Sequence, residues 1–132
     1  MKIMAKFPHY LQLDAMDCGP ACLRMIASHY GREFNQARLR ELCLIGKGGV
    51  SMLGITEAAE KIGLRALAVR LSYKKLLEEA PLPCIAHWNQ DHFVVVHKIT
   101  KRTIHVADPA MGLMTYSLTE FQLGAAPLLT PC

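Results

Sequence analysis

The chain has 132 residues, of which 52% are hydrophobic and 20% are charged, and its formal net charge is +4. This composition is typical of one globular domain with a fair-sized core and excludes a disordered chain. The positive charge is mild and forms no polybasic arm, so we expect no nucleic-acid partner. No apolar run approaches the ~20 residues that span a bilayer.

The cysteines indicate a reducing compartment. There are five of them, an odd number, at irregular spacing. This pattern does not resemble a disulfide framework, and the sequence shows no signal peptide, so we expect reduced thiols in a cytosol. Because the chain stops at Pro131-Cys132 without a polar tail, we also expect it to be a domain cut from a longer protein.

The first predicted helix begins immediately after a cysteine. Gly19 and Pro20 fall where the chain would enter that helix, and proline is well tolerated in a first helical turn. The helix continues over residues 21–30, and Gly31 is placed to end it. Cys18 therefore lies at or beside a helix N-terminus, where unpaired N–H groups and the helix dipole favour a thiolate.

Two more helices complete the first half of the chain. Asn35 is placed to cap a helix over residues 36–44. Ser51 is placed to cap a third helix that runs to Ile62 and stops at Gly63. The first half of the chain is therefore predicted to be helical.

The second half has the pattern of an antiparallel sheet. The strongest strand is His92–Ile99, because valine and other β-branched residues dominate it. The other predicted elements are strands over 64–71, 83–88, 104–107 and 113–116, short helices over 72–79 and 117–121, and turns over 89–91, 100–103 and 108–112. Helices followed by a sheet predict an α+β fold of two lobes with a cleft between them.

A hairpin register brings two polar residues together. If the strand at His92 pairs with the next one across a tight turn, residues whose numbers sum to about 200–203 face each other. Lys98 then lies near Thr103, and His92 lies near Asp108 or Pro109. Cross-strand neighbours have Cβ atoms about 4.5–5.5 Å apart, so the Asp108 carboxylate can reach the His92 ring.

These residues and Cys18 make up the requirements for nucleophilic catalysis. A nucleophilic cysteine needs an imidazole that takes its proton and a third group that orients the imidazole. We expect His92 to act as the base and Asp108 to stay ionised and orient it. The side-chain amide of Gln12, six residues before the cysteine, could stabilise an oxyanion together with the Cys18 N–H.

Other roles compete for several of these residues. Asp-Pro after a strand is a common turn, and a histidine at a strand end can be satisfied by the backbone, although the hairpin register makes the pair more informative than either residue. Met52 and Trp88 could line a substrate cleft or fill the core. Zinc is a further alternative, with candidate ligands Cys18, Cys22, Cys84, His87, His92 and His97. The two nearest cysteines lack the usual close spacing, and the last two histidines fall on opposite strand faces, so we expect no metal.

Five stretches in a fixed order carry a resemblance to a known family: Gln12-Leu-Asp-Ala-Met-Asp-Cys18-Gly-Pro-Ala-Cys22-Leu, Tyr30-Gly31, Gly49-Val-Ser-Met-Leu-Gly54-Ile, Trp88 through His92-Phe-Val-Val-Val, and Asp108-Pro-Ala-Met-Gly112. They resemble the bacteriocin-processing peptidase domain, a papain-like cysteine protease domain at the N-terminus of peptide-exporting ABC transporters. The similarity covers nearly the whole chain and weakens after Phe121. It implies an N-terminal helical lobe packed on a C-terminal antiparallel β-sheet lobe. Residues 1–132 would then be a single peptidase domain, the N-terminal domain of a longer ABC transporter.

The resemblance also implies roles and partners. The triad would be Cys18, His92 and Asp108, and Gln12 would belong to the oxyanion hole. The enzyme would remove the leader from ribosomally made bacteriocin-like precursor peptides after a double-glycine type motif, coupled to export. Its partners would be that precursor and the transmembrane and nucleotide-binding domains of the transporter, on the cytoplasmic side of a bacterial membrane. The peptidase would need no cofactor, whereas the rest of the transporter would use ATP and Mg²⁺.

Two other functions stay open on the sequence. A non-hydrolytic leader-docking or regulatory domain of a transporter could hold the same triad unproductively. A stand-alone thiol hydrolase or acyltransferase could use the same fold. Cleavage of a leader peptide would distinguish the first of these from the peptidase, and sequence beyond residue 132 would bear on the second.

Overall fold

The computed structural model describes residues 7–12, 17–43, 50–88 and 92–131, with side chains up to residue 123. The predicted turn over 89–91 and the last residue of the predicted helix over 36–44 lie outside the described residues. Among the residues described, no helix is both long enough and apolar enough to cross a membrane.

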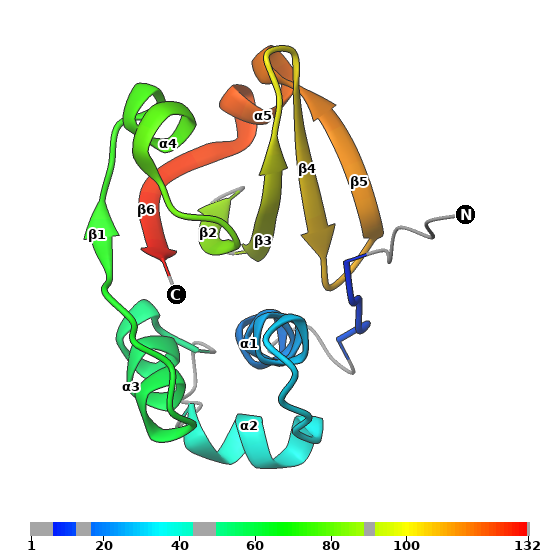
Figure 1. Ribbon diagram of the computed structural model, residues 1–132, viewed down its shortest axis with the longest axis vertical. Helices are drawn as coiled ribbons and strands as arrows, with labels where there is room; N and C mark the ends of the chain where they lie inside the picture. Colours follow the sequence, from blue (N-terminus) through cyan, green and yellow to red (C-terminus); the bar gives the residue numbers. More distant parts are fainter. Residues whose placement is uncertain (1–6, 13–16, 44–49, 89–91, 132) are drawn as a thin grey trace.

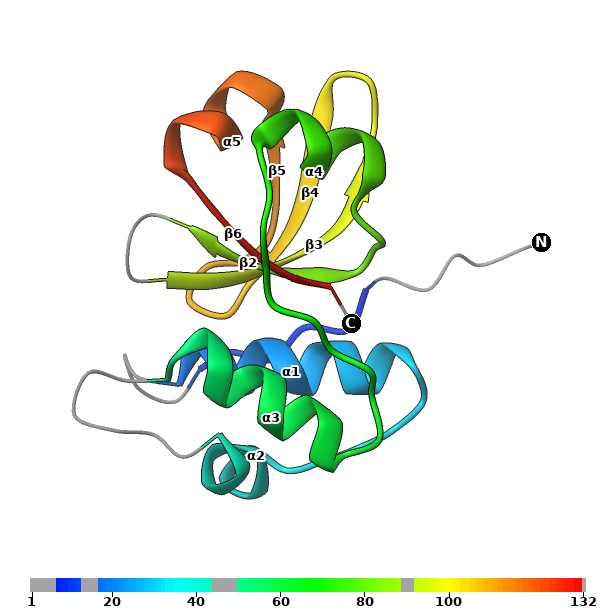
Figure 2. The ribbon, with the colours of Figure 1, turned by 90° about the vertical axis from the view of Figure 1, so that its left-hand side faces the viewer.

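The chain forms a helical layer first and a sheet afterwards. The elements are α1 (Cys18–His29), α2 (Gln36–Leu42), α3 (Met52–Lys61), β1 (Val69–Arg70), α4 (Tyr73–Glu79), β2 (Cys84–Trp88), β3 (His92–Ile99), β4 (Thr103–Asp108), β5 (Gly112–Ser117), α5 (Leu118–Gly124) and β6 (Ala125–Pro131). Helices α1 to α3 lie below the sheet and α4 and α5 above it (Figures 1 and 2). The predicted α+β class, with a helical lobe packed on an antiparallel sheet, is confirmed.

The helix boundaries follow local capping chemistry. Asn35, Ser51 and Ser72 each accept a hydrogen bond from the N–H three residues later, at 2.8, 3.0 and 3.2 Å, which satisfies a donor of the first turn. Gly31 and Gly63 follow the ends of α1 and α3 at φ +83° and +90°, which only glycine adopts readily. The predicted caps and stops of these helices are confirmed.

All pairings in the sheet are antiparallel, in the order β1-β6-β2-β3-β4-β5. In the β3–β4 hairpin Lys98 pairs with His105, so the predicted proximity of Lys98 to Thr103 is wrong by two residues. The reason is the turn, which the Thr100 N–H closes on the Thr103 carbonyl at 2.9 Å. The register then shifts between Lys98 and Val96, so that Val96 pairs with Val106.

Two other boundaries differ from the prediction. Of the strand predicted over 64–71, only Val69–Arg70 pairs in the sheet, and its partner is β6. The residues before it run along the helical layer, where Leu64 and Ala66 pack against its core. Their apolar side chains therefore serve packing between layers and not a strand. Helix α5 continues past the predicted end at 121 to Gly124, and β6 follows it directly.

Strand β3 is buried on both of its faces. Val94 and Val96 belong to the core beneath α4 and α5, whereas Phe93 and Val95 belong to the core between the sheet and α1. A third core fills the space between the three N-terminal helices. Helix α1 therefore packs on the middle of the sheet, beside β3, and this packing sets where the start of α1 lies.

Candidate active site

Cys18 is the first residue of α1, as the position of Gly19 and Pro20 predicted. Only 6% of its surface is exposed, and it belongs to the core between α1 and the sheet. A side chain at Gly19 would lie 3.0 Å from Val50 and 3.1 Å from Ile55, so glycine permits the close approach of this helix end to α3. The thiol is therefore held rigidly at the positive end of a helix dipole.

His92 and Asp108 meet at the ends of adjacent strands. Nε2 of His92 and Oδ1 of Asp108 are 2.6 Å apart, and the carboxylate is only 2% exposed. The same oxygen accepts a hydrogen bond from the Ala110 N–H at 2.8 Å. The Cys18 side chain also acts on this imidazole and contributes to its raised pKa. The contact predicted between His92 and Asp108 is present, and the cysteine reaches the same imidazole.

The charges in this cluster support one another. The hydrogen bond with Asp108, and after it the one with Cys18, raises the pKa of His92 to about 9 against the opposing effect of burial. Burial alone would raise the pKa of Asp108, but the hydrogen bonds from His92 and the Ala110 N–H outweigh it and lower that pKa. At neutral pH the cluster therefore holds an imidazolium between a carboxylate and the sulfur.

The N-terminal segment is tied to the turn that follows Asp108. The Gln12 N–H donates to the Pro109 carbonyl at 2.8 Å, and Nε2 of His9 lies 2.7 Å from the Asp108 carbonyl. Gln12 is thus placed beside the turn that carries the carboxylate. Sequence reasoning missed His9, because neither its spacing nor its neighbours distinguish it from a surface histidine.

The Peptidase C39 profile matches residues 6–123, which is most of the chain. The chain belongs to the Peptidase C39 family. Cysteine-peptidase chemistry is the class of activity that this membership supports, and it agrees with the thiol, imidazole and carboxylate described above.

Curated relatives of this C39 domain are much longer proteins. It is 41% identical over 115 residues to the lactococcin-G-processing and transport ATP-binding protein LagD of Lactococcus lactis subsp. lactis, covering 83% of this chain and 16% of that protein. It is 33% identical over 117 residues to the colicin V secretion/processing ATP-binding protein CvaB of Escherichia coli, covering 87% and 16%. The chain thus spans about a sixth of the length of these relatives.

Solved structures agree with the sequence comparison. A double glycine motif protease from an AMS/PCAT transporter, crystallised with its leader peptide, superimposes with a TM-score of 0.91 at 32% identity, covering 96% of this chain and 90% of that one. The peptidase domain of Streptococcus ComA, a bifunctional ABC transporter of a quorum-sensing pathway, gives a TM-score of 0.87 at 30% identity, covering 95% and 96%. The predicted resemblance is confirmed.

The two residues suggested for substrate contact lie in different surroundings. Trp88 is buried in the core beneath α5, where its Nε1–H donates to the Phe121 carbonyl at 3.0 Å and its ring stacks on the Phe121 ring. This is the position of a core residue. Met52 begins α3 and is half-buried against the core that contains Cys18. Of the two, Met52 is the one placed near the thiol.

The candidate zinc ligands are divided between separate cores. Cys18 and Cys22 face the core between α1 and the sheet, whereas Cys84 lies on the opposite side of the sheet. Cys22 donates its S–H to the Phe93 carbonyl at 3.2 Å. Within the described ranges, no three histidine, cysteine or acidic side chains converge on a point where a metal ion could bind.

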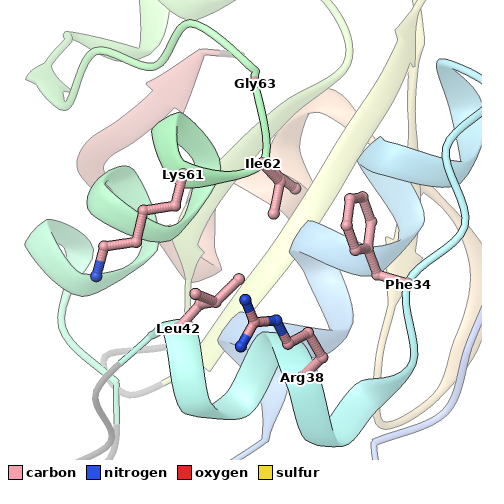
Figure 3. A pocket seen from close by; sticks show the side chains of 6 residues that line it. All are labelled: Phe34, Arg38, Leu42, Lys61, Ile62 and Gly63. Carbon is pink, nitrogen blue, oxygen red and sulfur yellow. The ribbon is translucent and has the colours of Figure 1, made fainter.

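A cavity of about 540 Å³ lies in the helical layer (Figure 3). It is lined by Phe34, Arg38, Leu42, Lys61, Ile62 and Gly63. Helices α2 and α3 supply half of this lining, and Figure 3 shows two cationic side chains beside three apolar ones. Cys18, His92 and Asp108 are not among the lining residues.

Proposed function

We propose that this C39 domain is a cysteine endopeptidase in which Cys18 is the nucleophile, His92 the acid and base, and Asp108 the orienting group. The observation that carries the proposal is the 2.6 Å contact between His92 Nε2 and Asp108 Oδ1, on an imidazole whose pKa Cys18 also helps to raise. Because Asp108 holds Nε2, Nδ1 is the ring nitrogen that serves the sulfur.

The raised pKa of His92 defines the resting state of this mechanism. With a pKa of about 9, the imidazole carries its proton at neutral pH. In the proposed mechanism the sulfur attacks as a thiolate paired with this imidazolium. The thiolate attacks the scissile carbonyl and forms a tetrahedral oxyanion. The Cys18 N–H and the Gln12 side-chain amide donate hydrogen bonds to that oxygen. His92 then protonates the leaving amine, and the base it becomes activates water to release the acyl group.

The substrate follows from the relatives. LagD and CvaB are described as processing proteins, and the double glycine motif protease was crystallised with a leader peptide. We propose that the domain cuts the leader from bacteriocin-like precursor peptides after a Gly-Gly or similar pair. Small residues before the scissile bond would enter a narrow space beside the buried thiol of Cys18.

The surrounding protein is also part of the proposal. The relatives that match this chain are ATP-binding transport proteins about six times its length. We place residues 1–132 at the N-terminus of an ABC transporter, on the cytoplasmic side of the membrane, where its transmembrane and nucleotide-binding domains export the cleaved peptide. ATP and Mg²⁺ act only on those other domains.

Mass spectrometry of a double-glycine precursor incubated with the domain under reducing conditions tests the proposed function. A cut directly after the glycine pair is expected with the unaltered chain and must be absent with Cys18→Ala. Cys84→Ala is the matched control, because this cysteine lies in the core on the opposite side of the sheet and has no place in the mechanism. Leader binding without a cut would overturn the peptidase proposal in favour of a docking domain.

A further inference from the structure

The residue before the nucleophile is a buried acid. Asp17 is the N-cap residue of α1, and its side chain is 1% exposed. Its Oδ1 lies 3.1 Å from Nε of Arg40, a side chain of α2 that is 46% exposed. A carboxylate is therefore held inside the protein next to a thiol, with an arginine from another helix beside it.

Helix capping does not explain this acid. An N-cap aspartate ordinarily accepts a hydrogen bond from the first turn of its own helix, but the Asp17 side chain makes no such bond. Its backbone carbonyl does accept from the Ala21 N–H at 3.0 Å. The side chain is directed instead toward α2.

Helix α2 reaches this residue at two points. Besides the ion pair from Arg40, Nε2 of the buried Gln36 donates to the Asp17 carbonyl at 3.4 Å. Gln36 and Arg40 are four residues apart, so they lie on one face of α2. The peptide that joins Asp17 to Cys18 is thus fixed by the helix behind it, and the N–H of that peptide is the proposed oxyanion donor.

The ion pair between Arg40 and Asp17 should affect how readily Cys18 forms a thiolate. A buried carboxylate is costly unless a cation compensates it, and removal of one partner of a buried pair leaves an uncompensated charge. An uncompensated negative charge beside Cys18 would oppose formation of the thiolate. Arg40 supplies the compensating charge.

We propose that Arg40 and Asp17 are positioning residues of the peptidase, which hold the Asp17–Cys18 peptide in place and cancel the negative charge beside the nucleophile. The inference rests on the proposed function, because it takes Cys18 to be the nucleophile. Neither residue touches the substrate. Both act through the reactivity of the thiol.

The test is a mutant cycle in which reactivity of the thiol is measured without any peptide substrate. The variants are Arg40→Gln, Asp17→Asn and the double variant. Arg38→Gln is the matched control, because Arg38 lies on the same helix and pairs with Glu41 at 3.7 Å on the exposed surface. The rate of alkylation by iodoacetamide is measured from pH 5 to 10 by peptide mass spectrometry at Cys18.

The cycle has a distinct expected outcome. Arg40→Gln should slow alkylation of Cys18 at pH 7 about tenfold and move the profile to higher pH, because the Asp17 carboxylate is then uncompensated. The double variant should return to within about threefold of the unaltered protein, because it removes both charges. Arg38→Gln should change nothing. In precursor cleavage, kcat should fall with alkylation while KM stays the same.

Three results would overturn the inference: an unchanged alkylation profile in Arg40→Gln, losses that add in the double variant, or an equal effect of Arg38→Gln. A merely structural role would lower the melting temperature without moving the profile. If Arg40→Gln does not fold, Arg40→Lys and the double variant decide, since near-normal alkylation in both supports the inference and loss in both contradicts it. Because alkylation needs no precursor, failure to cleave any precursor would count against the proposed function alone.

Discussion

The two sides of the candidate active site are held in place by different kinds of interaction. His92 and Asp108 stand on β3 and β4, adjacent strands whose backbones are hydrogen-bonded to each other. Cys18 stands on α1, which is joined to the sheet through packed side chains and the bond from Cys22 to the Phe93 carbonyl. The proposed acid–base pair is therefore fixed by main-chain register, and the proposed nucleophile by packing.

This difference indicates which core has the larger influence on the distance between Cys18 and His92. The backbone pairing of two strands tolerates small changes in side-chain volume, because its hydrogen bonds do not depend on them. A packed interface shifts when a methyl group is lost, since the surrounding structure relaxes only partly. The distance from sulfur to imidazole should therefore depend on the core between α1 and the sheet more than on the core beneath α4 and α5.

Removal of the His92 imidazole eliminates the proposed acid–base group on the sheet and should have the largest effect on activity. His92→Ala should lower kcat for precursor cleavage about a thousandfold or more, because neither thiolate formation nor protonation of the leaving amine is then assisted. His87→Ala, on the neighbouring strand β2, is the control and should retain activity. A His92→Ala protein with more than a tenth of the normal kcat would exclude the proposed role.

A pair of adjacent valines tests the comparison directly. Val95 and Val96 are both fully buried. Val95 belongs to the core between α1 and the sheet, whereas Val96 belongs to the core beneath α4 and α5. Each change to alanine should lower the free energy of unfolding by about 2 kcal/mol, measured by urea denaturation. Only Val95→Ala should also reduce kcat, about fivefold, because α1 moves relative to His92. Equal kcat values in the two variants would contradict the comparison.

The pH dependence of stability tests the electrostatic interaction between His92 and Asp108. The folded-state pKa of His92 is raised to about 9 from 6.5, so the protonated ring stabilises the folded state. This contribution is fully present below pH 6.5 and is lost as pH rises through 9. Its size is on the order of 3 kcal/mol.

Urea unfolding at pH 6.5 and pH 9.5 measures this loss. Asp108→Asn should remove most of the difference between the two pH values, because Asp108 is the main cause of the raised pKa of His92. An Asp108→Asn protein that loses as much stability as the unaltered chain between these pH values would refute the assignment.

The smallest effect is expected at His9, which joins the N-terminal segment to the sheet side. His9→Ala removes the contact to the Asp108 carbonyl and should lower kcat about threefold, with KM unchanged. The control is His105→Ala, because His105 contacts the hydroxyls of Thr103 and Thr115 and the His97 ring, away from Asp108. A loss of equal size in both variants would mean that the His9 contact has no particular role.

Much of the site could be predicted because its chemistry is local. The start of α1 follows from Gly19 and Pro20, and the helices after it follow from the caps Asn35 and Ser51. The meeting of His92 with a residue sixteen positions later follows from the register of one hairpin, although Lys98 lies opposite His105 and not Thr103.

The remainder depends on contacts between distant parts of the chain. Leu64 and Ala66 have the apolar character of a strand, but they pack on the helical core, and no local signal distinguishes these two outcomes. The pairing of Asp17 with Arg40 requires α2 to pack behind the start of α1, which spacing along the sequence cannot reveal. His9 was missed for the same reason.

The position of β6 has a consequence for the order of folding. This last strand lies between β1 and β2, and β1 is joined to the sheet only through it. Pairs such as Val69 with Leu129 close a loop of nearly half the chain, and contacts this distant in sequence form slowly. During synthesis the hairpins of β2 to β5 can form early. The sheet is completed only when β6 has left the ribosome, so the domain reaches its final form last at the edge farthest from Asp108.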